Sequence, residues 1–227
     1  DGIFLGFATH NQVIRNHVSN SRYGIHYMYA NDNVFVDNVF TRGVAGAAIM
    51  FSRNITFRGN EFSYNRSPAS GFGLLFKDVD NLEMTDNLVH HNRLGITMEG
   101  VPNEPGSFVT LRHNLIGFNQ VALEMATTTG VTFTENTFTG NLEQVATTGG
   151  SIEHRNTWAV AGRGNYWDDY EGYDANGDGV GDIPFRYEGA FDDLVRRNEA
   201  VRAYSFTPAR SALDLAHVLH EAREQGD

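Results

Sequence analysis

Two sets of side chains in this sequence have the types and spacing of metal ligands, and the first is a group of soft donors. Met28 and Met50 are about 22 residues apart, and His26 precedes Met28 by two positions. Thioether sulfur and imidazole nitrogen are donors that suit Cu(I). If the chain repeats at this interval, the two methionines lie on adjacent turns of a coil, about 4.8 Å apart. The hypothesis is a transient copper site formed by His26, Met28 and Met50.

The second set is a short acidic segment toward the end of the chain. Oxygen-bearing side chains occupy positions one, three, five and nine of an EF-hand-like calcium loop: Asp174, Asn176, Asp178 and Asp182. Gly179 stands at the sixth position, but Phe185 replaces the bidentate glutamate at the twelfth, so Asp192 or Asp193 would have to supply that ligand. The alternatives are a structural calcium ion and an Asx-rich turn that caps the repeats without metal.

The elements that position these residues are repeats of about 22 residues, in which an asparagine and a glycine recur at fixed places. The asparagines are Asn16, Asn38, Asn60, Asn87, Asn114, Asn136 and Asn156. The glycine positions are Gly2, Gly24, Gly46, Gly73, Gly95 and then Ala122. Self-similarity at this period indicates a solenoid. Asparagine tolerates the left-handed backbone region and bonds neighbouring backbone, so we expect the asparagines to be structural turn residues that stack from rung to rung.

Each repeat has three short apolar segments, one after the glycine and one on each side of the asparagine. Apolar residues alternate along the first segment, which is typical of a strand with one buried face. Three short strands per repeat predict an all-β protein, a parallel β-helix, whose core includes Met84, Met98 and Met125. The two longer repeats place insertions at residues 65–70 and 100–106. His90, His91 and His113 fall on turns or outward positions, where we expect them to face solvent.

The pattern divides the chain into three parts. Residues 1–160 are expected to form about seven rungs, residues 161–190 an acidic loop and cap, and residues 191–227 a helical extension. Thr207 and Pro208 are typical of a helix start, and an i, i+3, i+4 apolar pattern follows them. The chain opens in strand register, so we expect earlier rungs and a targeting segment to precede it.

Composition excludes some functions. The 227 residues carry 17 basic and 28 acidic side chains, a net charge of −11, which argues against binding to nucleic acid. No apolar run is long enough to span a membrane. The chain has no cysteine, which suits an oxidising or a metal-handling compartment.

Two stretches of the sequence resemble the NosD family: SRYGIHYMYANDN at residues 21–33 and NYWDDYEGYDANGDGVGDIPFRY at residues 165–187. The resemblance covers essentially the whole chain and identifies it as a C-terminal portion of such a protein. It implies a right-handed parallel β-helix in the periplasm that is not an enzyme. It also implies a role in assembling the copper sites of nitrous oxide reductase, with the ABC transporter formed by NosF and NosY and the copper chaperone NosL as partners.

Alternative interpretations of the outward face remain open. Phe4, Met28, Met50 and Leu75 would form an apolar patch covered by a partner or by the terminal helix. Many β-helices bind or cleave polysaccharides, and Lys77 with Glu99 and Glu124 are the residues that could serve such chemistry. A scaffold that holds no metal of its own is the third possibility.

Overall fold

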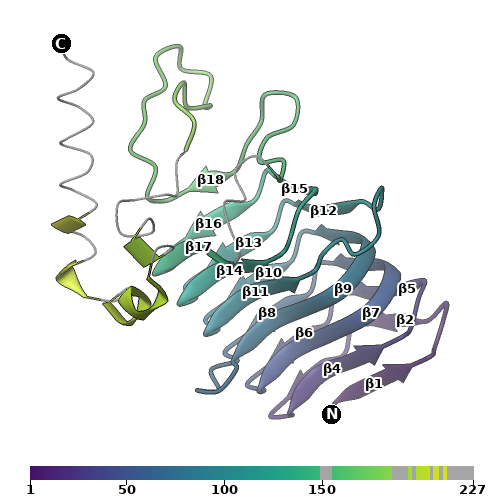
Figure 1. Ribbon diagram of the computed structural model, residues 1–227. Helices are drawn as coiled ribbons and strands as arrows, with labels where there is room; N and C mark the ends of the chain where they lie inside the picture. The colour runs from purple at the N-terminus through teal and green to yellow at the C-terminus, as the bar shows by residue number, and fades with distance from the viewer. Residues whose placement is uncertain (149–154, 186–193, 196–197, 205–206, 210–211, 214–227) are drawn as a thin grey trace. The chain divides into compact units, whose positions relative to one another are not determined.

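The computed structural model describes residues 1–148, 155–185, 194–195, 198–204, 207–209 and 212–213. The chain forms two compact units, Asp1–Gly181 and Asp182–Asp227. The first unit is a parallel β-helix, as the repeat predicts, in which the strands of successive rungs lie side by side (Figure 1). In the second unit the structure describes a 3₁₀ helix, η1 (Glu199–Tyr204). Most of the helix predicted after Thr207 lies outside the described residues.

Each rung contributes one strand to each of three faces, and on every face the strands of neighbouring rungs pair in parallel. The first face consists of β1 (Ile3–Gly6), β4 (Tyr23–Met28), β7 (Ala45–Arg58), β9 (Phe72–Thr85), β11 (Leu94–Glu99), β14 (Val121–Ala126) and β17 (Glu143–Thr148). The second face consists of β2 (Gln12–Ile14), β5 (Asn33–Val36), the later halves of β7 and β9, β12 (Val109–Arg112) and β15 (Val131–Thr134). The third face consists of β3 (His17–Ser19), β6 (Val39–Thr41), β8 (Glu61–Ser63), β10 (Leu88–His90), β13 (Leu115–Gly117), β16 (Thr137–Thr139) and β18 (Tyr166–Trp167).

The core is a column of apolar side chains that stack from rung to rung. Phe35 stacks on Phe57 with ring centroids 4.7 Å apart, and both rings are fully buried. Glycine recurs near the start of the first-face strands because the rungs approach closely there. A Cβ on Gly73 would lie 2.5 Å from the carbonyl oxygen of Gly95. The register of β9 with β11 and β12 leaves the extra residues of the later insertion between Glu99 and Val109, as predicted.

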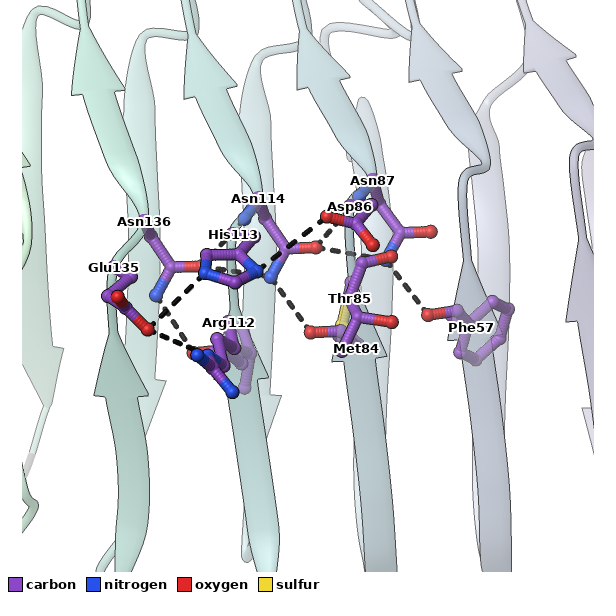
Figure 2. Close-up of polar contacts among 11 residues, drawn as sticks. Phe57, Met84, Thr85, Asp86, Asn87, Arg112, His113, Asn114, Glu135 and Asn136 are labelled. Carbon is purple, nitrogen blue, oxygen red and sulfur yellow. Dashed lines mark hydrogen bonds and ion pairs between the residues drawn. The ribbon is translucent and has the colours of Figure 1, made fainter. Parts of the chain in front are cut away.

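The asparagines form a continuous hydrogen-bonded ladder, shown for its central members in Figure 2. Asn114 Oδ1 accepts hydrogen bonds from the backbone N–H and the Nδ2 of Asn87, at 3.0 and 2.9 Å. Its own Nδ2 donates to the carbonyl of Met84 at 3.0 Å and to Oδ1 of Asn136 at 2.9 Å. The ladder residues from Asn38 to Asn136 are buried. Each amide therefore satisfies backbone groups of the previous rung that water does not reach.

Two details of the predicted ladder are wrong. Its last member is Asn165, which accepts from Asn136, while Asn156 accepts from the backbone of Val131 on the second face. Trp158, two residues after Asn156, accordingly stacks on Phe133 of the second face, and Trp167 stacks on Phe138 of the third face. The left-handed conformation belongs to the residue before each asparagine, with φ between 54° and 65°: Arg15, Asp37, Gly59, Asp86, His113 and Glu135. The asparagine is selected for its amide, which bonds the turn, and not for its backbone.

Asp86, His113 and Glu135 occupy this left-handed corner on three successive rungs (Figure 2). His113 lies between two carboxylates, with Nε2 3.3 Å from Glu135 and Nδ1 3.8 Å from Asp86. Arg112 Nε donates to Glu135 Oε2 at 2.7 Å. This hydrogen bond from the guanidinium is the main cause that lowers the pKa of Glu135 below its ordinary value.

We expect Asn114→Ala to lower the free energy of unfolding by about 2–4 kcal/mol, because it leaves buried groups of Asn87 and Met84 without partners. Urea denaturation of the two proteins measures the difference. The matched control is Asn103→Ala in the exposed insertion loop, which should change stability by no more than about 0.5 kcal/mol. Equal effects of the two substitutions would contradict the role of the ladder.

We expect Arg112→Gln to raise the pKa of Glu135, which carboxyl NMR titration measures directly. Because the folded-state pKa is lowered, the pair stabilises the fold above the unfolded-state pKa. This contribution is lost as the pH falls through the lowered folded-state pKa, so the difference in melting temperature between the two proteins should shrink on acidification. Arg58→Gln, in the same column of the second face, should leave the pKa of Glu135 unchanged; an equal shift there would refute the pairing.

Candidate functional site

The structure brings the two outward methionines together. Met28 of β4 pairs with Met50 of β7 in register, and His26 pairs with Ala48 two positions earlier on the same face. The predicted adjacency of Met28 and Met50 is therefore confirmed, whereas their role as metal ligands stays a prediction.

The outward-facing residues of the first face are less exposed than a strict in–out alternation of side chains along each strand predicts. His26, Met28 and Met50 are half-buried, and Ala48 is fully buried. Ala48 lies between His26 and Leu75 in register. The donor atoms consequently sit in a partly desolvated surface, where a metal ion would meet fewer competing water molecules.

His26 is held in place from several sides. Its Nδ1 lies 2.9 Å from Oδ2 of Asp1, and its ring packs between Phe4 and Tyr23 at centroid distances of 5.3 and 5.0 Å. Burial, followed by the nearby charge of Arg22, lowers the pKa of His26. The neutral imidazole is the form that binds metals. In metal-binding histidines, the ring nitrogen that does not bind the metal typically has a hydrogen-bond partner, which orients the ring.

An exposed aromatic stack lies beside the methionines, and sequence reasoning missed it. Phe7, Tyr29 and Phe51 stack face to face on successive rungs, at 5.4 and 5.1 Å. Each directly follows an outward residue of the first face and has a positive φ near 50°. The signal was present as three aromatic residues that recur about every 22 positions, but periodicity alone did not distinguish this turn from the core.

The residues considered for polysaccharide chemistry are engaged by neighbours. Lys77 Nζ lies 3.2 Å from Oε2 of Glu99, so the lysine that a lyase would use as a base is in an ion pair. Glu124 accepts a hydrogen bond from Thr97 at 3.3 Å. Glu124 also pairs in register with Thr97, and not with Glu99. The arrangement does not set two carboxyl groups across a cleft as a glycosidase requires.

The acidic loop closes on its own backbone. The carboxylate of Asp174 accepts hydrogen bonds from the N–H groups of Gly177, Asp178 and Gly179, at 2.7, 3.2 and 2.8 Å. These bonds, led by that from Gly179, lower the pKa of Asp174. Asn176 Nδ2 donates to Asp178. Across the part of the chain that the structure describes, no three His, Cys, Asp or Glu side chains converge as a metal site. The calcium assignment stays a prediction.

No helix among the described residues is long and apolar enough to cross a membrane.

Comparisons with known proteins agree on one family. Residues 1–172 match the family model described as "Periplasmic copper-binding protein (NosD)". The chain is 31% identical over 177 residues to the "Probable ABC transporter binding protein NosD" of Stutzerimonas stutzeri, a match covering 73% of this chain and 39% of the relative. It is 27% identical over 168 residues to the protein of the same name from Pseudomonas aeruginosa, covering 70% and 38%. The chain spans well under half the length of these relatives. On the strength of the repeat, the parallel β-helix and the match over residues 1–172, this chain belongs to the NosD family.

Proposed function

We propose that this chain is part of a periplasmic copper-binding protein that hands copper on during assembly of nitrous oxide reductase. The description of the family supports the location and the metal. The names of the two relatives support association with an ABC transporter, for which NosF and NosY are the proposed components. NosL, as copper donor, and nitrous oxide reductase, as recipient, complete the proposed set of partners. No catalytic step is needed for this role.

The observation that carries the proposal is the pairing of Met28 with Met50 beside an imidazole oriented by Asp1. Cu(I) is the cargo, and thioether sulfur is a soft donor that prefers it to harder cations. With Nδ1 of His26 directed at Asp1, Nε2 is the nitrogen left to bind the ion. Three protein donors leave a coordination position for a ligand from the donor or recipient protein. Such an open site suits transfer better than storage.

The aromatic stack of Phe7, Tyr29 and Phe51 adds a reason to place partner contact at this face. Phe7 is 82% exposed, and the stack directly adjoins the methionine pair. Burying exposed aromatic rings is a principal source of affinity between proteins. A donor or recipient that covers this stack would bring its own copper ligands next to Met28 and Met50.

We expect the purified chain to bind Cu(I) in anaerobic competition with a chromophoric chelator. Met28→Leu/Met50→Leu should weaken binding at least about tenfold, and adding His26→Gln should abolish it, because these changes remove the soft donors. The fold should survive, since Met and Leu have similar volumes.

The matched control is Met98→Leu/Met125→Leu, a second pair of methionines in register on neighbouring rungs, but fully buried in the core. This pair should leave copper binding unchanged. Copper binding that survives loss of Met28 and Met50 would show the site assignment to be wrong. A wild-type chain that binds no Cu(I) would leave the methionine face as a docking surface only.

The prediction of a structural calcium ion at Asp174, Asn176, Asp178 and Asp182 has a separate test. If calcium binds, adding it to chelator-treated protein should raise the melting temperature by ligand stabilisation. Asp174→Asn should then remove the increase. A melting temperature that calcium leaves unchanged in the wild type would contradict the calcium site, and the turn closed by its own N–H groups would then cap the repeats without metal.

A further inference from the structure

Two histidines converge at the corner that follows the third face, far along the chain from His26. His90 is the last residue of β10, and His91 has a left-handed φ of 55°. Side chains of consecutive residues in an extended strand point to opposite sides, but the left-handed turn brings these two rings together. Their Nδ1 atoms lie 2.8 Å apart, and the ring planes are inclined at 84°. The two ring nitrogens are thus adjacent and hydrogen-bonded to each other.

Neighbouring rungs hold the His91 ring in this orientation. Tyr64 stacks on one side of it at 4.8 Å and 22°, and Phe118 on the other side at 5.1 Å and 26°. Tyr64 and Phe118 are themselves 42% and 53% exposed. The ring is therefore clamped but lies at a surface that a small ion can reach.

His90 has the outer contact of a metal-binding histidine. Its Nε2 lies 3.4 Å from Oε1 of Glu61 on the preceding rung. Ser63 Oγ donates to the same oxygen at 2.7 Å and so fixes the carboxylate. A carboxylate on the far nitrogen of an imidazole orients the ring and strengthens the near nitrogen as a donor.

The separation of the two nitrogens can be compared with that of ligands in known metal geometries. With metal–nitrogen bonds of about 2.0 Å, two ligands at 90° lie about 2.8 Å apart, whereas tetrahedral ligands lie about 3.3 Å apart. The observed 2.8 Å is the length of the hydrogen bond between the rings, and it is also the separation of two ligands at a right angle. Tetragonal sites with nitrogen ligands are typical of Cu(II) and Ni(II), and Cu(II) binds more tightly.

We propose that His90 and His91 form a second metal site, which takes Cu(II) through the two Nδ1 atoms, with Glu61 orienting His90 and water completing the coordination. Without metal, one imidazole donates its Nδ1–H to the other. Arg42 and Arg66 lie 5.8 Å from the Tyr64 ring, and Arg66 bonds the carbonyl of His91. These cations oppose a bound cation and keep the affinity moderate. The site does not depend on Met28 and Met50 or on the Cu(I) carrier function.

The test is a titration of the full chain with Cu(II), followed by electron paramagnetic resonance. We expect a tetragonal signal with splitting from two nitrogen ligands, and weaker binding of Zn(II). His90→Gln and His91→Asn should each weaken Cu(II) binding at least about tenfold and remove the two-nitrogen splitting. Asparagine is chosen at His91 because it tolerates the left-handed turn. Glu61→Gln should weaken binding by about tenfold while the two-nitrogen splitting remains.

Two controls separate this site from others. His113→Asn removes a more exposed imidazole, at the same kind of left-handed turn, whose nitrogens face Asp86 and Glu135 rather than a second imidazole, and it should leave the signal unchanged (Figure 2). Met28→Leu/Met50→Leu should weaken Cu(I) binding but keep the Cu(II) signal, so the two proposals fail independently. A two-nitrogen signal that persists in both His90→Gln and His91→Asn, or its absence from the wild type, overturns the second site.

Discussion

The amide ladder of buried asparagines is the interaction on which the rest of this structure depends. A coil of short strands must turn sharply three times per rung, and every turn leaves backbone groups that no strand pairs. At the corner between the second and third faces, the asparagine amide bonds two such groups of the preceding rung. Asn114, for example, accepts the backbone N–H of Asn87 and donates to the carbonyl of Met84. Because each amide also bonds the next amide, the rungs are locked at one spacing and one register.

A single register turns the protein surface into columns of residues that are distant in sequence. Met28 and Met50 share one column, whereas Phe7, Tyr29 and Phe51 share the adjoining one. Changing one residue of a column alters the chemistry of that strip without disturbing the turn that carries it. The insertion after Glu99 likewise leaves the register undisturbed. Its loop is hydrogen-bonded to buried Asp80, and strand pairing resumes at Val109.

The two proposed metal sites use this architecture in different ways. The two sulfur donors of the methionine face come from two rungs, and these soft donors suit Cu(I). The histidine corner draws both ligands from consecutive residues, and neighbouring rungs supply only the aromatic clamp and the orienting carboxylate. Because imidazole alone is a borderline donor, this corner suits Cu(II). A protein with both would distinguish the oxidation states of one metal by the hardness of its donors.

The sequence by itself determined the repeat, the parallel β-helix, the place of the insertion after Glu99 and the adjacency of Met28 and Met50, because a fixed period reports which residues share a position on successive rungs. Only the tertiary structure decided that Asn165 and Trp167 close the last rung, since the intervening loops break the period there. It also decided how far Met28 and Met50 are covered and that Asp1 holds His26. The convergence of His90 and His91 was equally hidden, because the direction of a side chain at a left-handed turn depends on the residues stacked above and below it.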